Sequence, residues 1–258
     1  MEFALLASGS SGNCMVVAEG KTRILIDAGI SCRQITDRLE ALGIAPKSID
    51  AICLTHDHHD HVSGLPVFCK KYGTPLYASL GTREAATYST HVNGAEWFEF
   101  APGDEMEIGS LSLASFAVPH DAGDPVGFTI CGGGRRLGIA TDLGYIPMMV
   151  ERHLQACHAL VLESNHDIEM LMRSDRPWNL KDRIKGRHGH LSNDQCAETL
   201  EKLLPGTLST LVLAHLSEEC NSPALAQNIA KKILRRHGIA ERVALHIAST
   251  DATGWMNV

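Results

Sequence analysis

The sequence predicts an α/β protein in which two β-sheets pack together and are covered by helices. Short apolar runs, typical of buried strands, occur in both halves of the chain. Segments with the helical spacing of apolar residues stand between and after these runs. The composition is globular, with 44% hydrophobic and 21% charged residues. No low-complexity linker interrupts the 258 residues, so we expect a single domain spanning 1–258.

The expected strands are short and are separated by turn residues. Glycine and serine dominate residues 8–12, and the glycine-rich residues 132–135 indicate a β-hairpin. Gly109 and Ser110 mark a turn between two further strands. We expect strands over residues 3–7, 14–18, 22–26, 49–54, 75–78, 106–108, 111–118, 127–131, 137–140, 159–162, 210–214 and 243–247.

The expected helices follow from the spacing of apolar residues and from their end signals. The first covers residues 31–42, with Ile35, Leu39 and Leu42 on one face and Gly43 at its end. The others are expected over residues 64–72, 148–154, 179–185, 193–203 and 223–237.

The composition excludes several classes of protein. A net charge of −7 argues against indiscriminate DNA binding over the whole surface, although it permits a local positive channel. No run approaches the roughly 20 apolar residues that span a bilayer, and no basic region precedes an apolar stretch at the N-terminus. We therefore expect neither a membrane span nor a signal peptide. The eight cysteines contain no C-x-x-C pair, which favours reduced, mostly buried thiols in a cytoplasmic protein.

Histidine is the unusual residue, with 14 copies. The densest group, Thr55-His56-Asp57-His58-His59-Asp60-His61, follows the expected strand 49–54. Imidazoles at alternate positions of an extended segment point the same way, so His56 and His58 can bind one cation. The chain then turns, and Asp60 and His61 can face a second cation. Nitrogen and carboxylate ligands together suit divalent ions such as Zn²⁺.

Three more residues of ligand type follow expected strands. They are His120 after strand 111–118, Asp142 after strand 137–140 and His215 after strand 210–214. Binding and catalytic residues often lie on loops that a rigid scaffold positions. The sequence therefore predicts that these residues complete the metal site.

These residues resemble the motifs of the metallo-β-lactamase superfamily. A fifth motif is Asp27 in Leu25-Ile26-Asp27-Ala28-Gly29, and the resemblance extends from Phe3 to about Pro223. It implies a four-layer αββα sandwich in which Asp27 holds a ligand imidazole through a hydrogen bond. It also implies two metal ions. One would be bound by His56, His58 and His120, and the other by Asp60, His61 and His215, with Asp142 bridging.

Other segments resemble particular branches of the superfamily. LESNHD at residues 162–167, GHLSN at 189–193 and LASGSSGN at 6–13 look like the small single-domain exonucleases called YycJ/WalJ. The GHLS element is similar to that of RNase Z, and phosphonate-pathway cyclic phosphodiesterases are similar too. The resemblance implies a DNA exonuclease of repair or replication. Alternatives are an RNA-processing nuclease, a hydrolase of small cyclic nucleotides or thioesters, and a metal-binding scaffold without catalysis.

The same resemblance implies roles beside the metals. His190 would handle the phosphate or protonate its leaving oxygen, and Glu163 would orient His190. Asp60 would be a catalytic residue as well as a ligand. Candidate substrate-binding residues are Ser10, Asn13, His166, Arg183 and Lys185. The remaining histidines, His59 among them, are expected to lie at the surface, to pack in the core or to contact the metal ligands.

A basic segment precedes His190. Residues 173–187 hold six basic and two acidic side chains, a net charge of +4, with Trp178 among them. Basic residues interleaved with an aromatic one fit backbone tracking and base stacking on nucleic acid. The basic residues of 231–236 are instead expected to serve solubility.

The expected metal site favours a phosphodiester substrate. Two divalent cations would make the pocket positive although the protein is negative overall, which suits an anionic substrate. A metal-bridging hydroxide would be the nucleophile, and the two cations would stabilise the charge of the attack. We therefore expect two divalent ions, Zn²⁺ or else Mn²⁺, and DNA rather than RNA as the partner. The sequence also allows a homo-oligomer.

Overall fold

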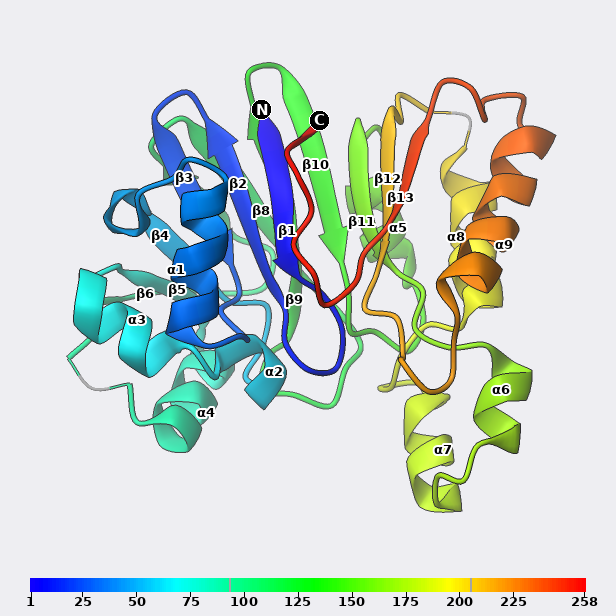
Figure 1. Cartoon of the computed structure of the whole chain (residues 1–258), viewed down its shortest axis with the longest axis horizontal. Helices are drawn as coiled ribbons and strands as arrows, with labels where there is room; N and C mark the ends of the chain where they lie inside the picture. Colours follow the sequence, from blue (N-terminus) through cyan, green and yellow to red (C-terminus); the bar gives the residue numbers. More distant parts are fainter. Residues whose placement is uncertain (93, 205) are drawn as a thin grey trace.

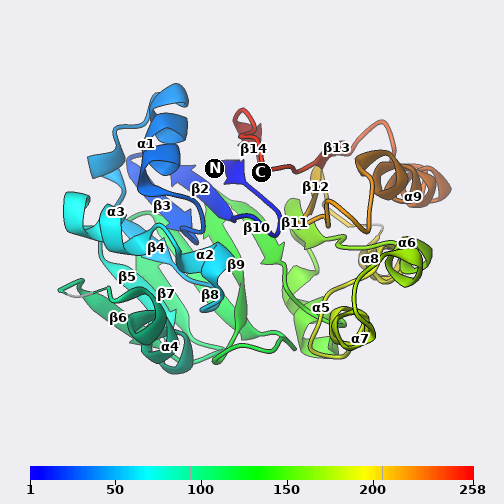
Figure 2. The same cartoon turned by 60° about the horizontal axis from the view of Figure 1, so that its bottom comes forward.

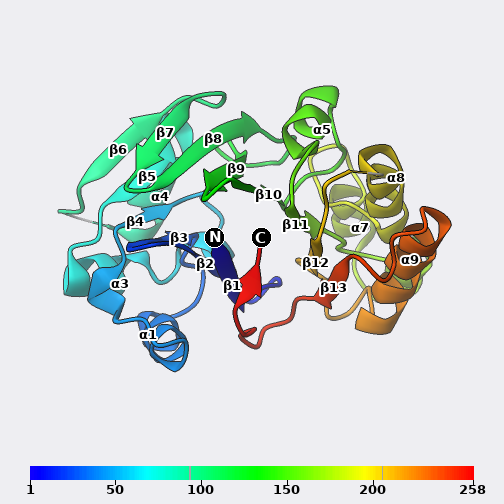
Figure 3. The ribbon, with the colours of Figure 1, turned by 90° about the horizontal axis from the view of Figure 1, so that it is seen from above.

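Two mixed β-sheets lie face to face, and helices cover the outer face of each sheet (Figure 1). The computed structural model describes residues 1–92, 94–204 and 206–258. The view from above shows the layers, with α1 and α3 outside one sheet and α8 and α9 outside the other (Figure 3). This arrangement confirms the predicted αββα fold.

Each sheet combines an antiparallel part with a parallel part. The first has the order β14-β1-β2-β3-β4-β5-β6, and the second has the order β13-β12-β11-β10-β9-β8-β7. In the first sheet β14 to β3 are antiparallel and β3 to β6 are parallel. The first sheet consists of β1 (Glu2–Ala7), β2 (Cys14–Glu19), β3 (Thr22–Ile26), β4 (Ala51–Cys53), β5 (Leu76–Ser79), β6 (Trp97–Phe100) and β14 (Met256–Asn257).

The second sheet repeats this plan. Strands β7 to β10 are antiparallel, and β10 to β13 are parallel. Its strands are β7 (Glu105–Ile108), β8 (Leu111–Ala117), β9 (Val126–Gly132), β10 (Arg135–Ala140), β11 (Ala159–Glu163), β12 (Thr210–Ala214) and β13 (Ala244–Ile247).

Alternating side chains connect the layers. In β1, Phe3 and Leu5 belong to the core between the sheets, whereas Ala4 and Leu6 belong to the core under the helices. In β12, Val212 faces the other sheet and Leu213 packs under the helices. Because successive side chains of a strand point to opposite faces, strands buried on both faces are apolar throughout.

Six helices of the described residues cover the sheets. The first sheet is covered by α1 (Cys32–Ala41), α3 (Leu65–Tyr72) and α4 (Leu80–Thr90), and the second by α5 (Met148–Leu154), α8 (Asn193–Leu203) and α9 (Pro223–Arg236). Ser31 begins α1 with a capping box to Gln34, and Ser192 begins α8 in the same way with Gln195. A 3₁₀ turn (Pro46–Ser48) precedes β4.

Three shorter helices lie at the end of the molecule that carries the histidine cluster. They are α2 (His59–Val62), α6 (Ile168–Arg173) and α7 (Trp178–Ile184). Figures 1 and 2 show α6 and α7 projecting from the second sheet as a helical hairpin.

The predicted strands and helices are all present, most within one or two residues of their expected ends, but five elements were not expected. They are α2, α4, α6, β6 and β14. The sequence of α4 contains Gly81, Thr82 and Ser89, which have weak helical preference. It forms because the Ser79 side chain accepts a hydrogen bond from the Thr82 N–H and Ala86 packs into the core.

The cysteines are packing residues. Seven of the eight are buried and Cys131 is half-buried. Burial raises the pKa of the Cys157 thiol to about 11 and that of Cys196 to about 12, so these thiols stay protonated at neutral pH. Among the described residues, none of the helices is both long enough and apolar enough to cross a bilayer.

Candidate metal centre

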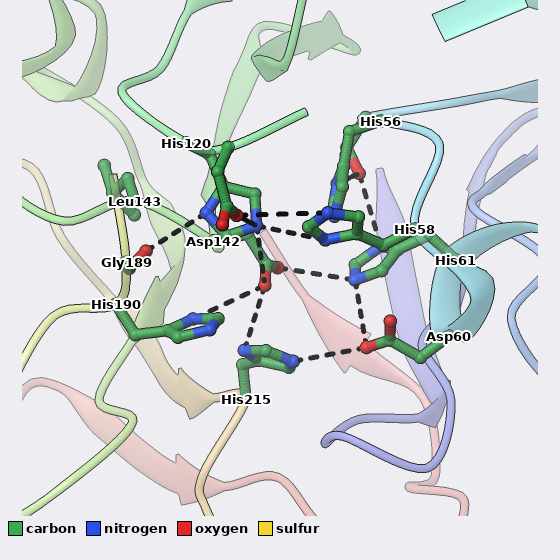
Figure 4. Close-up of polar contacts among 12 residues, drawn as sticks. His56, His58, Asp60, His61, His120, Asp142, Leu143, Gly189, His190 and His215 are labelled. Atoms are coloured by element: carbon green, nitrogen blue, oxygen red, sulfur yellow. Dashed lines mark hydrogen bonds and ion pairs between the residues drawn. The ribbon is translucent and has the colours of Figure 1, made fainter. Parts of the chain in front are cut away.

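The first group of imidazoles comes from two loops. The loop between β4 and α2 carries His56 and His58, and α2 begins at His59. His120 follows β8 and meets them. The His120 ring centroid lies 5.0 Å from that of His56 and 4.9 Å from that of His58. All three rings face one space (Figure 4).

The second group combines two imidazoles with a carboxylate. Asp60 and His61 lie in α2, and His215 follows β12. Asp60 Oδ2 lies 3.5 Å from His61 Nε2 and 3.6 Å from His215 Nε2. Within each group the nitrogen and oxygen atoms lie within 4.8 Å of one another, a spacing that can hold a metal ion.

Asp142 lies between the two groups. Its Oδ2 is 3.4 Å from His61 Nε2, and its Oδ1 is 3.2 Å from His215 Nδ1 and 4.0 Å from His120 Nε2. Figure 4 shows this carboxylate at the centre of the converging side chains. The structure therefore brings together all seven residues that the sequence predicted as ligands.

Two buried carboxylates orient the imidazoles. Asp27 Oδ2 accepts hydrogen bonds from His61 Nδ1 at 2.8 Å and from the Thr55 hydroxyl at 2.9 Å. Glu163, which is completely buried, contacts His190 Nδ1 at 2.8 Å and His215 Nδ1 at 3.0 Å through Oε1. A hydrogen bond at Nδ1 fixes the ring and directs Nε2 of His61 toward the centre.

The charges of the site reflect these contacts. Burial opposes ionisation of Glu163, but the imidazoles of His190 and His215 outweigh it and hold the pKa of Glu163 well below its usual range. Burial also opposes charge on His215, yet Asp142, Asp60 and Glu163 raise its pKa to about 10. His56 is different, because burial and the neighbouring imidazoles lower its pKa. Its ring is therefore neutral, the form in which imidazole binds metal.

The backbone at three of these positions is left-handed. Asp27, Asp142 and His215 have φ angles of 60°, 58° and 55°, and each directly follows or lies close behind a strand. Such conformations cost roughly 1–3 kcal/mol for residues other than glycine and cluster at functional sites. The fold thus maintains strain where these side chains turn into the centre.

Unpaired buried atoms test whether the site fits cations. Among the described residues, six buried side-chain atoms have no hydrogen-bond partner, and half of them lie at this centre: His56 Nε2, Asp142 Oδ2 and His215 Nε2. A buried polar atom without a partner is costly, and here all three belong to the predicted ligand set. Divalent cations would satisfy them, so the residues fit a metal centre.

A cavity of about 310 Å³ opens onto the centre. His190 lines it, with its ring centroid 5.3 Å from that of His120 and 5.2 Å from that of His215. Of the residues predicted to bind substrate, Ser10 and Arg183 also line this cavity.

Close backbone contacts place His190 at the cavity. A Cβ atom on Gly144 would collide with the carbonyl of Gly186, and one on Gly189 would collide with the carbonyls of Arg183 and Ile184. The loop after Asp142 can therefore pack directly against the loop before His190. The Gly189 carbonyl also accepts a hydrogen bond from His120 Nδ1 at 3.1 Å.

Comparison with known proteins identifies the family. Residues 22–216 match the family described as the β-lactamase superfamily domain. The chain belongs to this superfamily. Exodeoxyribonuclease YycJ of Bacillus anthracis is 32% identical over 252 residues, which cover 97% of this chain and 96% of that protein. Exodeoxyribonuclease WalJ of Streptococcus pneumoniae (strain D39) is 35% identical over 228 residues, covering 87% and 85%.

Solved structures show the same superfamily fold. Zn²⁺-bound PqqB from Methylobacterium extorquens has a TM-score of 0.74 and 19% identity, and 100% of both chains is covered. These matches confirm the predicted resemblance to the metallo-β-lactamase superfamily and to its YycJ/WalJ branch. Together with the grouped histidines and aspartates, they identify this protein as a metal-dependent hydrolase.

Three candidate substrate-binding residues of this superfamily member lie outside the cavity lining. Asn13 Nδ2 donates to Asp60 Oδ2 at 3.1 Å, so Asn13 supports a carboxylate of the centre. His166 is buried, and burial lowers its pKa to about 4. Lys185 is exposed and pairs with Asp182 at 3.0 Å.

Sequence reasoning missed other residues of the cavity. His59, expected elsewhere, lines it, as do Asn165, Arg176, Leu180, Ile184 and Ser217. His59 begins α2, a helix of one turn that the sequence did not indicate. The segment LESNHD at residues 162–167 includes Asn165, but nothing in this segment alone says which of its side chains face the cavity.

Proposed function

We propose that this protein is a metal-dependent phosphodiesterase that removes nucleotides from the ends of DNA. The observation that carries the proposal is the meeting of two possible cation sites at Asp142, in a cavity that also contains His190. Two relatives that align with most of this chain are named exodeoxyribonucleases. The free thiols of the chain suit a reducing compartment such as the cytoplasm.

Each cation would have its own ligands. His56, His58 and His120 would hold one, and Asp60, His61 and His215 the other, with Asp142 shared between them. This set of nitrogen and carboxylate ligands suits Zn²⁺ and also accepts Mn²⁺. When bound, such cations lower the pKa of water to about 7 and neutralise the oxygens of a phosphate.

His190 would give a proton to the departing oxygen. Its Nδ1 contacts Glu163 Oε1 at 2.8 Å, which leaves Nε2 available to the cavity. Glu163 also accepts hydrogen bonds from the Leu143 and Leu191 backbone N–H groups through Oε2, so its position is fixed. A side chain that donates a proton in this way typically accelerates a reaction by about 10² to 10⁴.

The size of the cavity favours cleavage at an end. A volume of about 310 Å³ lies at the lower limit of small-molecule sites, which run from roughly 300 to 1,000 Å³. Such a space suits one nucleotide unit and not a length of duplex. This fit supports the proposal that nucleotides are removed one at a time.

The direct test uses purified protein stripped with a chelator and reloaded with Zn²⁺ or Mn²⁺. It is offered linear duplex DNA, single-stranded DNA, covalently closed circular DNA, RNA, a chromogenic phosphodiester and a glutathione thioester. We expect mononucleotides from linear DNA and no cleavage of closed circles. Asp60→Ala, which removes a proposed ligand, should abolish the release.

Other outcomes would redirect the proposal. Cleavage of the closed circle would show an endonuclease. Hydrolysis of the chromogenic ester or the thioester alone would show an enzyme for small substrates. Faster release of nucleotides from RNA than from DNA would show a ribonuclease.

A further inference from the structure

α7 and the residue Arg176 before it form one wall of the cavity. Arg176 precedes α7 and Arg183 lies in its last turn, and both line the cavity together with Leu180 and Ile184. Figure 1 shows the hairpin of α6 and α7 projecting from the second sheet at the end where the metal centre lies. Two guanidinium groups therefore face the same space as the proposed ligands.

Each of the two arginines is held by one carboxylate from another part of the chain. Arg176 Nε donates to Glu219 Oε2 at 2.7 Å. Arg183 donates to Asp121 from Nε at 2.6 Å and from Nη2 at 3.1 Å. Asp121 Oδ1 also lies 3.7 Å from His120 Nε2 and 3.9 Å from His58 Nε2.

These pairs connect the two arginines to two chain segments that carry imidazoles of the metal centre. Asp121 directly follows His120, so Arg183 lies one carboxylate away from the first group of imidazoles. Glu219 lies four residues after His215, so Arg176 is paired with the segment that carries a proposed ligand of the second group. Both arginines therefore line the space next to the position of a phosphate held at the centre.

The hairpin is anchored so that the arginines keep their positions. Lys181 lies between them and is buried, and its Nζ donates to the carbonyls of Met172 at 2.9 Å and Ser174 at 2.7 Å. These bonds tie α7 to the end of α6. The packing of Gly144 against Gly186 fixes the other end of α7 to the loop after Asp142.

The carboxylate partners leave the arginines available to a stronger ligand. The side chains of Arg183 and Glu219 are 51% exposed, and those of Arg176 and Asp121 are 27% and 35% exposed, so water reaches both ion pairs and weakens them. A phosphate carries charge and oxygens on several sides and can bind guanidinium groups in a bidentate manner. A phosphate can therefore compete with these carboxylates for the two guanidinium groups.

We propose that Arg176 and Arg183 bind the phosphate next to the one that is hydrolysed. This inference rests on the proposed function and narrows its substrate class. The favoured substrate carries at least two phosphate groups along one strand, as an oligonucleotide end does and a cyclic nucleotide does not. The arginines would select the substrate without taking part in the bond cleavage.

Dinucleotides provide the test. The reloaded wild-type protein is given a dinucleotide with one phosphodiester, the same molecule with a 5′-phosphate, and the same molecule with a 3′-phosphate. We expect one phosphorylated form to be preferred about tenfold in kcat/KM, and its identity reports the polarity of the strand. In Arg176→Ala/Arg183→Ala the preference should fall to within about twofold.

A matched control distinguishes phosphate binding by the two arginines from a general effect of removing positive charge. Lys231→Ala/Arg235→Ala removes the same charge from the exposed face of α9, and this variant should keep the preference. The salt dependence of oligonucleotide binding supplies a second readout. Its slope in a log–log plot should decrease by about 0.7 for each phosphate of single-stranded DNA that the arginine variant no longer binds.

Three results would overturn the inference. They are a wild-type protein that treats all three dinucleotides alike, an arginine variant that keeps the preference, and a variant whose activity falls equally on all three. Failure of the proposed function gives a different result, because the wild-type protein would then release no nucleotide from linear DNA or from any dinucleotide.

Discussion

The metal centre and the α6–α7 hairpin hold their polar groups in different ways. At the centre, His61 and His215 are fixed through Nδ1 by Asp27 and Glu163, and all four side chains are at most 5% exposed. On the hairpin, Arg183 is fixed by a carboxylate that is itself 35% exposed. Buried contacts preserve one geometry, which chemistry requires, whereas exposed pairs can exchange partners. We therefore propose that the reaction takes place at the first region and that the second region selects the substrate.

The largest expected effect is at the carboxylate that joins the two groups. Asp142→Asn keeps the shape and tolerates the left-handed backbone, but it removes a negative charge between the imidazoles. We expect the bound metal to fall below two ions per chain and kcat/KM to decrease at least about 10³-fold, comparable to removal of a major electrostatic contact. Elemental analysis and hydrolysis of DNA measure the two effects. Full metal content with full activity would remove Asp142 from the centre.

The next largest effect is expected at His190, where a loss of turnover can be distinguished from a loss of bound metal. His190→Ala should lower kcat by about 10²-fold or more, because the departing oxygen loses its proton donor. Metal content should stay near that of the wild-type protein. The control is His188→Ala, which removes an exposed imidazole two residues away and should not lower kcat. A loss of metal in His190→Ala would instead make His190 a ligand.

A smaller effect is expected at Asp27, which contacts the proposed ligand His61. Asp27→Asn weakens the contact with His61 Nδ1 without reaching the cavity, and it also tolerates a positive φ angle. Substitutions of this kind cost about 10- to 100-fold in metal affinity or activity. Competition with a chromophoric chelator measures the affinity, with Asp50→Asn as the control because Asp50 accepts a bond from the Arg23 N–H in another part of the first sheet. Equal affinities in the two variants would contradict this role.

The smallest effect concerns the hairpin. Lys181→Met removes a charged donor from the Met172 and Ser174 carbonyls, which should cost about 1.5–3 kcal/mol of local stability. Amide hydrogen exchange should become faster in α6 and α7 while metal content is retained. Faster amide exchange around β12 and α2 as well would show that the metal centre and the hairpin are coupled. That result would contradict the division of roles between the two regions.

The sequence predicted the metal centre because its signals are local. Each ligand-type residue follows a recognisable strand, and the histidine cluster spans only six residues, from His56 to His61. Ends of strands that lie side by side in the two sheets bring such residues together without further information. Asp27 and Glu163 came instead from the resemblance to the superfamily, and the left-handed backbone at Asp27 has no signal of its own.

The hairpin was harder to predict because its partners are distant in the chain. The basic segment stood out through its net charge of +4, but Arg183 pairs with Asp121, 62 residues away, and Arg176 pairs with Glu219, 43 residues away. Lys181 counted as a candidate cation for nucleic acid, yet it is buried against two carbonyls. No local pattern distinguishes a lysine that anchors a turn from one that faces a ligand.

Anomalous diffraction from crystals grown with Zn²⁺ or Mn²⁺ tests the central claim most directly. We predict two peaks, one among His56, His58 and His120 and the other among Asp60, His61 and His215, with Asp142 next to both. The absence of any peak there, or metal bound only at other residues, would contradict the account.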